Sequence, residues 1–441
     1  MADEEQNKQS DFMIEKIKNR PINKKKLLRR TVTTAVMAVI FGLVACLTFL
    51  ILEPVFSNWL YPEEEPPKII FPEEEDEVPP EDMLVEEEPP DSSIQEEVET
   101  ILLEDEGIRE ILENIQLDQD NYIQLYSIMA EYTASLRPYM VTVTAVTSNE
   151  DWLNNVNERL GQTYGTIVAS NGIEWMILTD WATIRRANDI CVTFCDGEQV
   201  EATIKQTDEQ TGLAVISVTI EEMPQTTRET AQVVTLGSSN MRDPLGIPVV
   251  AMGCPLGTVG SIGYGMIAGK GGALNLEDAN YRTFITDIYG SENAAGALFD
   301  MQGKLIGIIT PSLTYDDMPN AIMAIGISDL RKLIENMSNE KEAAYLGISA
   351  IDVTTEANQE MQVPFGAYVK DIAMDSPAML AGIQRGDVIV EMDGIRIDNC
   401  INYTSVIQRL EAGQTIVVVV QRLSQDSYRR MEMEITLEAA E

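Results

Sequence analysis

Residues 285 to 312 read ITDIYGSENAAGALFDMQGKLIGIITPS, and this stretch guides the interpretation of the whole chain. Its second half alternates apolar and polar residues on both sides of a turn at Gln302 and Gly303, which predicts an antiparallel hairpin. We expect the two strands to cover residues 297 to 301 and 305 to 310. The first half of the stretch is predicted to be a tight loop that leads into this hairpin.

Composition restricts the chemistry of the chain. Its 441 residues, 44% of them apolar, are enough for two or three domains with cores of their own. It contains no histidine, which excludes Ser-His-Asp and Cys-His catalysis, histidine metal sites and histidine pH sensing. The net charge of −41 at pH 7 makes nucleic acid an unexpected partner, because like charges repel. No cofactor and no metal site is predicted.

The first part of the chain predicts a membrane anchor. Residues 1 to 30 are polar and end in a basic cluster, and residues 31 to 52 then run without a charge. As a helix this run is about 33 Å long, enough to cross a bilayer. Bases before it and acids after it predict a cytoplasmic tail (1–30), an uncleaved single-pass helix (31–53) and an extracytoplasmic bulk. A cleaved signal peptide and a lipoprotein site at Cys46, which follows Leu-Val-Ala, are the alternatives.

Two segments separate this predicted helix from the first folded domain. Residues 54 to 92 are dominated by Glu and Pro, as in PEEEPP and PEEEDEVPPED, and predict a disordered, extended acidic linker. Residues 93 to 136 carry apolar residues at helical spacing, with a second helix predicted over residues 122 to 134. That helix either packs on its own domain or mediates self-association.

The pattern changes at residue 137. Up to residue 340 the sequence consists of short runs rich in Val, Ile and Thr separated by Gly, Asp and Asn, which is typical of an all-β sandwich or barrel. Strands are predicted over residues 140–146, 164–169, 176–179, 190–194 and 249–252, among others. Cys191 and Cys195, four residues apart on one predicted strand, are about 13 Å from each other, too far for a disulfide. We expect the cysteines to be small buried hydrophobic residues.

Five segments in order resemble motifs of the HtrA (Deg) family of trypsin-like serine proteases. They are MILTDWATI, TDEQTGLAVISV, LGSSNMRDPLGIPVVAMGCPLG, the 285–312 stretch, and AIGISDLRKLIENM. The resemblance implies a mainly β fold, with a chymotrypsin-like double β-barrel over residues 137 to 340. It also implies that the chain assembles as a homotrimer, as members of this family often do.

The same resemblance implies that the catalytic residues are missing. The positions of the imidazole, the carboxylate and the nucleophile correspond to Ala182, Gly212 and Ala294, none of which carries the chemistry that a serine protease needs. Glu292 stands where the oxyanion loop has a glycine, and its charge would oppose a developing oxyanion. The degenerate triad therefore implies a catalytically inactive member of the family.

Some hydroxyl and amino groups remain nearby in the sequence. Ser291 and Thr183 have no imidazole to activate them. A dyad that pairs a hydroxyl with a buried lysine is the enzyme alternative, and its candidate lysines are Lys205, Lys270 and Lys304.

The last hundred residues resemble an α+β PDZ domain of the HtrA type, over residues 341 to 441. The strings AYLGISAI and SPAMLAGIQRGDVI match its carboxylate-binding loop and its core signature. The resemblance implies that backbone N–H groups of this loop receive a peptide C-terminus, while the following strand pairs with the peptide. The implied peptide-binding residues are Tyr345, Leu346, Gly347, Ile348, Tyr403 and Ile407.

These observations lead to one preferred function. The chain is expected to be a membrane-anchored, extracytoplasmic pseudoprotease that binds polypeptides or their C-termini as a scaffold, chaperone-like holder or regulator of protein quality control. A serine-type endopeptidase with a replaced mechanism and a structural stalk with an inert head are the alternatives. Substituting Gly347→Val is expected to abolish peptide binding while leaving the PDZ domain folded.

Overall fold

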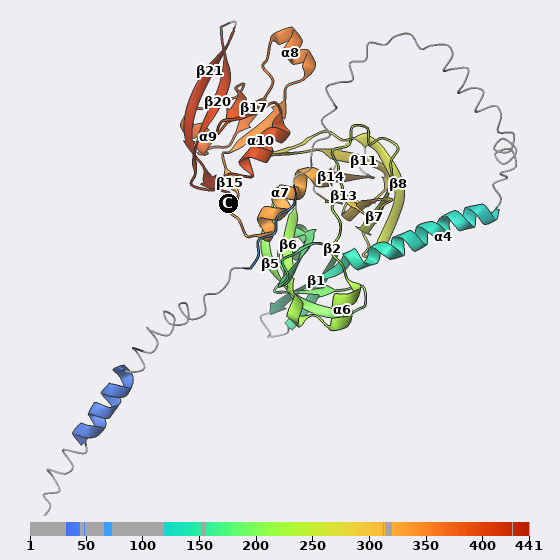
Figure 1. Cartoon of the computed structure of the whole chain (residues 1–441), viewed down its shortest axis with the longest axis vertical. Coiled ribbons are helices and arrows are strands. Elements are labelled where there is room, and N and C mark those ends of the chain that lie inside the picture. The colour runs from blue at the N-terminus through green and yellow to red at the C-terminus, as the bar shows by residue number, and fades with distance from the viewer. Residues whose placement is uncertain are drawn as a thin grey trace, which may run out of the picture. The chain divides into compact units, whose positions relative to one another are not determined.

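The computed structural model describes residues 32–44, 48, 66–72, 119–150, 156–311, 313, 320–425 and 427–440 (Figure 1). The chain divides into two compact units, Met1–Pro66 and Pro67–Glu441. The predicted cytoplasmic tail and the helical stretch from 93 to 118 lie outside the described residues. So does Cys46, which was the candidate lipidation site.

Within the first unit, residues 32 to 44 are helical. Their apolar side chains are exposed, with Met37 at 67% and Phe41 at 76% of full accessibility. In the part of the chain that the structure describes, no helix has both the length and the apolar character needed to cross a bilayer. The predicted span over residues 31 to 53 is only partly covered by the described residues.

Six strands of the second unit close into a first barrel in the order β1-β2-β3-β6-β5-β4. β3 is buried along almost its whole length because Ile177 faces the barrel interior, while Met176 and Leu178 face the second barrel. This explains a continuous apolar run in place of strict alternation. The strands are β1 (Met140–Glu150), β2 (Val156–Ser170), β3 (Glu174–Asp180), β4 (Asp189–Thr193), β5 (Gln199–Asp208) and β6 (Leu213–Thr219); the helices are α5 (Trp181–Ile184), η2 (Ile220–Glu222) and α6 (Gln225–Thr230).

A second barrel closes in the order β11-β14-β13-β12-β7-β8. The predicted hairpin is confirmed as β12 and β13, which pair Ala297 with Ile308 across the turn. A short two-stranded hairpin, β9 and β10, lies between β8 and β11 in the sequence. The strands are β7 (Pro248–Cys254), β8 (Ser261–Lys270), β9 (Leu274–Leu276), β10 (Ala279–Tyr281), β11 (Thr283–Tyr289), β12 (Ala295–Asp300), β13 (Leu305–Ile309) and β14 (Ala321–Gly326).

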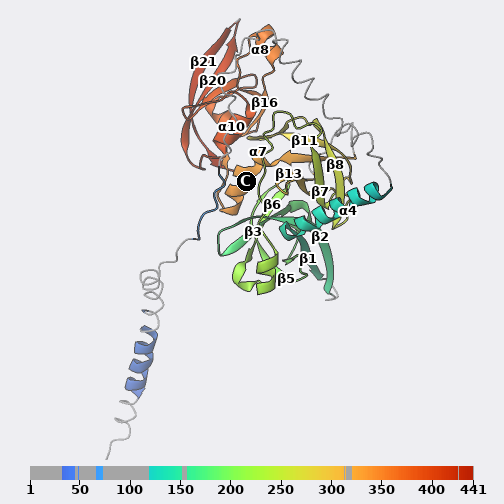
Figure 2. The same ribbon diagram turned by 45° about the vertical axis from the view of Figure 1, so that its right-hand side comes forward.

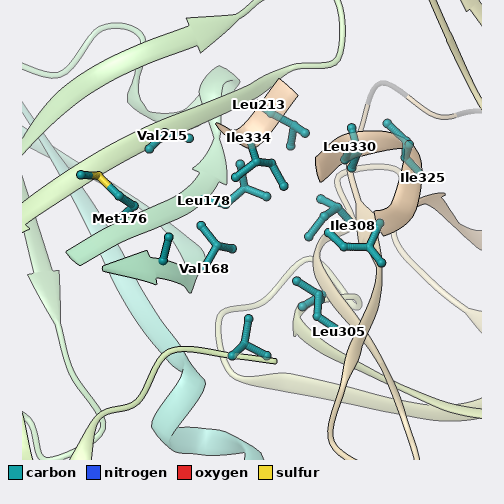
Figure 3. Packing of buried hydrophobic residues seen from close by; sticks show 14 of the residues in the cluster. Val168, Met176, Leu178, Leu213, Val215, Leu305, Ile308, Ile325, Leu330 and Ile334 are labelled. Carbon is teal, nitrogen blue, oxygen red and sulfur yellow. The ribbon is translucent and has the colours of Figure 1, made fainter. Parts of the chain in front are cut away.

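One hydrophobic core joins both barrels to the helix α7 (Ile327–Ser338). Figure 3 shows Leu178 and Leu213 of the first barrel together with Ile334 of α7 in this core. The helix packs against strands of both barrels, so it fixes their relative position. The double barrel implied by the sequence is thereby confirmed as a single packed domain.

Part of the predicted disordered linker packs on this domain. Ile69 is buried in the shared core, and its backbone N–H donates to Asn339 Oδ1 at 2.9 Å. The N–H of Phe71 donates to Glu335 Oε2 at 3.0 Å. The expectation of a linker without fixed contacts is therefore wrong for these residues, because a short apolar run interrupts the Glu and Pro repeats and finds a partner in α7.

The predicted second helix is confirmed as α4 (Gln119–Leu136), followed by the 3₁₀ turn η1 (Arg137–Tyr139). Its C-terminal end is anchored, because Leu136 is buried in the shared core and the Thr133 side chain is buried as well. Its N-terminal half exposes a set of apolar side chains: Tyr122, Ile123, Leu125, Tyr126 and Ile128.

The last hundred residues form the predicted PDZ domain, with a main sheet in the order β16-β17-β18-β20-β21 and its own hydrophobic core. In Figure 2, the strand β16 and the helix α10 that flank its groove are both labelled. The strands are β15 (Ala344–Tyr345), β16 (Ile348–Asp352), β17 (Ala367–Ile372), β18 (Val388–Met392), β19 (Ile395–Arg396), β20 (Thr415–Ser424), β21 (Ser427–Thr436) and β22 (Glu438–Ala439); the helices are α8 (Thr355–Met361), α9 (Pro377–Ala381) and α10 (Cys400–Ile407).

Candidate functional site

The fold brings the three substituted catalytic positions to one place. Ala182 lies in α5 directly after β3, Gly212 directly before β6, and Ala294 directly before β12. β3 and β6 pair in antiparallel register, and the N–H of Trp181 donates to the carbonyl of Gly212 at 2.9 Å. The first two positions are therefore neighbours through the backbone.

A cavity between the two barrels connects all three positions. It is lined by Asp180, Leu213 and Ala295, each of which lies within two residues of one substituted position. Its volume of about 20 Å³ is enough for about one water molecule. The site of a trypsin-like catalytic centre is thus present as a location, with almost no free space.

The acidic side chain in this cavity is used for capping a helix. Asp180 is buried and accepts hydrogen bonds from the backbone N–H of Thr183 at 2.9 Å and from its hydroxyl at 2.7 Å. This is the arrangement of an N-cap residue at the start of α5. The Thr183 hydroxyl thus donates to the carboxylate that caps the helix, and the chain contains no imidazole to activate it.

The loop at the nucleophile position uses its own hydrogen-bond donor. The backbone N–H of Ala294 donates to the carbonyl of Ser291 at 3.0 Å. In a working serine protease the N–H of the nucleophile points at the developing oxyanion. Here that donor is engaged inside the loop, while the carboxylate of Glu292 is exposed beside it.

The carboxylate position has a left-handed backbone. Gly212 has a φ of +74°, in a region that most residues with a side chain rarely adopt. Aspartate tolerates this region better than most residues, and Asp278 of this chain adopts a φ of +55°. The backbone at Gly212 therefore favours glycine without excluding an aspartate.

A second small cavity is lined in part by Ala294. It measures about 20 Å³, room for about one water molecule and too little for a side chain. Its described lining residues are Ser291, Glu292, Ala294, Ile309, Thr310, Pro311, Leu313, Ala321, Ile322 and Met323.

Other side chains do not replace the missing nucleophile or base. Burial raises the pKa of the Cys254 thiol to about 11, so it is almost entirely protonated at neutral pH and poorly reactive. Lys205 is paired with Glu174 at 2.9 Å, and Lys270 Nζ donates to a carbonyl oxygen at 3.1 Å. Among the described residues that line the two cavities there is no lysine.

The cysteines agree only in part with the prediction of buried residues. Cys254 and Cys400 are buried and Cys191 is half-buried, but Cys195 is exposed in the turn that follows β4. The prediction failed for Cys195 because the strand ends before it. All four described cysteines are free thiols, and the described residues hold no cluster of side chains suited to a metal ion.

The carboxylate-binding loop of the PDZ domain is fully formed. Gly347 has a φ of +85°, which turns the chain so that three consecutive N–H groups point in the same direction. These groups belong to Leu346, Gly347 and Ile348, and all three donate to one carboxylate, that of Asp278, at 2.7, 2.6 and 3.0 Å. The predicted donors are therefore brought together.

Asp278 comes from the turn between β9 and β10, which form a two-stranded sheet separate from the two barrels. The hydroxyl of Tyr403, on α10, donates a fourth hydrogen bond to the same carboxylate. Burial raises the pKa of Asp278, and the four hydrogen bonds oppose that rise. The pKa of Tyr345 rises to about 12 because of burial and the nearby carboxylates of Glu277 and Asp278.

The backbone around Asp278 pairs with the PDZ domain as a peptide would. The N–H of Asp278 donates to the carbonyl of Ile348 at 2.8 Å, and Glu277 forms an antiparallel bridge with Ser349. Strand addition at β16 combined with a carboxylate on the loop N–H groups is how PDZ domains bind a peptide C-terminus.

The remaining predicted peptide-binding residues are located as follows. The Tyr345 hydroxyl donates to Glu277 Oε2 at 3.3 Å. Ile407 is buried in the PDZ core. The expectation that Gly347→Val leaves the domain folded conflicts with the packing, because a Cβ atom there would lie 2.3 Å from Cβ of Ser376.

Sequence reasoning did not find Asp278. It lies in a short turn of ordinary composition. Its three backbone donors are 68 to 70 residues away, and Tyr403 is 125 residues away. Backbone donors leave no side-chain pattern, so no local signal in the sequence pointed to this contact.

Comparisons with known proteins agree with this architecture. Residues 163–308 match a model of the trypsin-like peptidase domain, and residues 344–435 match a model of the PDZ domain. The fold and the site thus define a trypsin-like domain joined to a C-terminal PDZ domain. The chain belongs to the HtrA/DegP-like family.

Individual relatives are distant. The serine protease Do-like HtrA of Bacillus subtilis is 24% identical over 294 residues, covering 62% of this chain and 64% of the relative. The serine protease HtrA-like of Staphylococcus epidermidis is 25% identical over 291 residues, covering 61% and 48%. The chain thus spans about half to two thirds of the length of these relatives. The solved structure of the HtrA-type protease AlgW with a decapeptide matches the fold with a TM-score of 0.52 and 21% identity, covering 71% of this chain and 99% of AlgW.

Proposed function

We propose that this chain is a membrane-anchored, extracytoplasmic HtrA-like pseudoprotease that binds polypeptides through the C-terminal carboxylate site of its PDZ domain. Such a protein acts as a scaffold, a chaperone-like holder or a regulator of protein quality control. The observation that carries this proposal is the convergence of three N–H donors, from Leu346, Gly347 and Ile348, on one carboxylate. A loop that binds a carboxylate of its own chain has the geometry to bind the C-terminal carboxylate of a peptide.

The proposed loss of proteolysis rests on the barrel. Ala182, Gly212 and Ala294 supply no base, no orienting carboxylate and no nucleophile. The N–H of Ala294 is used within its loop, and each neighbouring cavity has room for about one water molecule. The alternative is an endopeptidase with a replaced mechanism, which would need another reactive group. The described residues that line these cavities include no cysteine and no lysine.

The proposed membrane anchor rests on residues 31 to 53. The uncharged run is long enough to cross a bilayer, and its described part, residues 32 to 44, is helical with exposed apolar side chains. Protease added to cells stripped of their outer layers should remove the chain beyond about residue 63 and leave a short membrane stub. Protection of the C-terminal domain would contradict this orientation.

Self-association of the chain as a homotrimer is proposed from the family and from α4. A helix that exposes Tyr122, Leu125, Tyr126 and Ile128 can bury them against a second copy. Analytical ultracentrifugation of the full chain in detergent should show trimers, and Leu125→Glu should shift the population to monomers. A monomeric wild-type chain would contradict the proposal.

One experiment tests peptide binding and proteolysis together. The full chain in detergent is incubated with unfolded casein, with a fluorophosphonate probe, and with a library of decapeptides that have a free or an amidated C-terminus. We expect intact casein, no covalent labelling, and enrichment of peptides with a free carboxylate only. Casein cleavage that survives repurification would contradict the loss of proteolysis, and equal capture of amidated peptides would contradict the binding mode.

A further inference from the structure

The groove of the PDZ domain already holds a segment of this chain. The β9–β10 hairpin lies between two strands of the second barrel in the sequence, yet it contacts both walls of the groove. On one side Asp278 and Glu277 pair with β16. On the other side the N–H of Asn280 donates to Thr404 Oγ1 on α10 at 2.8 Å. The segment thus lies between the strand and the helix that receive a peptide.

The contact is specific for a carboxylate. Asp278 uses both of its oxygens, with Oδ2 accepting from Leu346 and Gly347 and Oδ1 accepting from Ile348 and Tyr403. The backbone of Asp278 continues into β10, so this carboxylate belongs to a side chain. It occupies the position that the C-terminal carboxylate of a bound peptide would take. Asp278 adopts a φ of +55°, a left-handed turn that aspartate tolerates better than most residues.

Occupation by Asp278 and by a peptide exclude each other. Each backbone N–H donates one full hydrogen bond, so the three donors cannot serve two carboxylates at once. The exposed edge of β16 can likewise pair with only one strand at this position. A segment tethered to the same chain is present at an effective concentration in the millimolar range, which a free peptide must overcome.

The occupied arrangement also contains a defect. Asn280 is 1% exposed, and its side-chain N–H groups donate to Ala350 O and to Asn275 Oδ1. Its side-chain oxygen is buried and has no hydrogen-bond partner among the described residues. A buried acceptor without a partner destabilises the packing around it. Several hydrogen bonds therefore hold the hairpin in the groove, and the unpaired oxygen of Asn280 destabilises this arrangement. Such a balance suits a segment that a peptide can displace.

We infer that Asp278 is an internal ligand of the PDZ carboxylate site, and that a polypeptide with a free C-terminal carboxylate binds this chain only by displacing it. This inference rests on the proposed peptide-binding function and specifies how that function is restricted. Most chains are closed without a ligand. The apparent affinity for a peptide is the intrinsic affinity reduced by the fraction of open chains.

The test compares the full wild-type chain in detergent with Asp278→Ala, Asp278→Asn and the control Glu277→Gln. Asp278→Asn keeps the shape of the side chain but removes one acceptor and the charge, so it tests the same contact if Asp278→Ala folds poorly. Glu277→Gln changes the neighbouring acidic residue, which contacts only Tyr345 through its side chain among the described residues. The probe is a pool of fluorescent decapeptides with randomised last residues, as free acids or as amides, followed by anisotropy.

Hydrogen exchange of the N–H groups of residues 346 to 348 is measured on the same samples. It reports directly whether the loop donors are engaged, whatever the peptide pool does. The remaining PDZ amides, for example those of β18, report whether each variant is folded.

We expect the free-acid pool to bind Asp278→Ala and Asp278→Asn at least tenfold more tightly than wild type, with Glu277→Gln resembling wild type and the amides not binding. Exchange of residues 346 to 348 should accelerate in the two Asp278 variants alone. Equal binding of free acids by wild type and the Asp278 variants would overturn the inference and leave the proposed function intact. If no free acid binds any folded variant, both the proposed function and the inference fail. Accelerated exchange at residues 346 to 348 in the Asp278 variants would then show that Asp278 does hold these N–H groups, and that what fails is the binding of a peptide in its place.

Discussion

The barrel site, which we define by Ala182, Gly212 and Ala294, and the PDZ groove differ in which chemical groups are present. In the barrel, the positions of the three catalytic residues still meet, but Ala182, Gly212 and Ala294 carry no reactive group. In the PDZ domain, three backbone N–H groups still converge, and they hold a carboxylate. The chemistry of a serine protease depends on particular side chains, so substitutions can remove it. Carboxylate binding by a loop depends on backbone N–H groups, which every residue except proline carries.

The difference extends to how each site is filled. The cavities beside the barrel site measure about 20 Å³ each and have room for about one water molecule. The PDZ groove is filled by a segment of the same chain, which other molecules with the same chemistry can replace. A cavity filled by the packing of its own walls has no room for a ligand. A groove filled by an exchangeable segment can be regulated by a competing ligand.

The largest expected effect concerns restoring the barrel site. The triple substitution Ala182→His, Gly212→Asp and Ala294→Ser should leave casein intact and remain unlabelled by a fluorophosphonate, about a millionfold below an active trypsin-like protease. The physical reason is the engaged N–H of Ala294, because the restored serine would still lack this donor for the oxyanion. Activity in the triple variant would mean that only side-chain chemistry distinguishes the barrel site from a working one.

The second prediction concerns the buried thiol of the barrel site. Burial raises the pKa of Cys254 to about 11, so at pH 8 about one thiol in a thousand is ionised. Alkylation by iodoacetamide should be on the order of a hundredfold slower than for an ordinary exposed thiol, which is itself only about 10 to 25% ionised at that pH, and each added pH unit up to the pKa of Cys254 should accelerate it about tenfold. Mass spectrometry of the labelled peptides measures this, with the exposed Cys195 as internal control. Rapid labelling of Cys254 at pH 8 would contradict the raised pKa of this thiol.

The third prediction concerns the loop that forms the carboxylate site. Gly347→Val should destabilise the PDZ domain by about 4 kcal/mol, because it combines a left-handed backbone with a Cβ atom 2.3 Å from Cβ of Ser376. Gly382→Ala, also at positive φ but with open space around its Cβ, should cost about 1 kcal/mol.

Hydrogen exchange of β18 amides during denaturation measures this difference. Tryptophan fluorescence does not report on the PDZ domain, because all four tryptophans precede that domain in the sequence. It is used instead to check that the barrel domain is unaffected. Similar losses of stability for the two glycine variants would show that the loop has room to adjust.

The smallest effect concerns an ion pair that supports the PDZ domain. Asp387 is 1% exposed and accepts two hydrogen bonds of 2.7 Å from Arg422. Arg422→Ala should cost about 3 kcal/mol because it leaves a buried charge without its partner. Arg396→Ala removes an exposed pair with Asp398 and should cost less than about 1 kcal/mol. The same exchange measurement applies, and equal effects would mean that Asp387 is compensated by water.

Much of the fold followed from local patterns. The alternation on both sides of Gln302 and Gly303 predicted the hairpin that became β12 and β13. The predicted helix over residues 122 to 134 lies within α4, and the loop before β16 lies where the PDZ resemblance placed it. Periodicity and turn residues are properties of neighbouring positions, so they are visible without a structure.

Other features depended on partners far away in the sequence. Ile69 was assigned to a disordered linker because its neighbours are Glu and Pro, and its burial depends on α7, about 270 residues later. Cys195 was expected to be buried because the predicted strand was extended to include it, whereas β4 ends two residues earlier, at Thr193. Local composition does not reveal whether a short apolar run will meet a complementary surface.

The sequence by itself determined that this chain has no imidazole, since no folding arrangement can supply a side chain that is absent. It also determined that the three catalytic positions, once identified by resemblance, lack a nucleophile and a base. Only the tertiary structure decided that the N–H of Ala294 is engaged within its loop and that Asp278 occupies the PDZ carboxylate site. The physical reason is that backbone donors are the same in every residue, so their direction and their partners are set by the packing of distant segments.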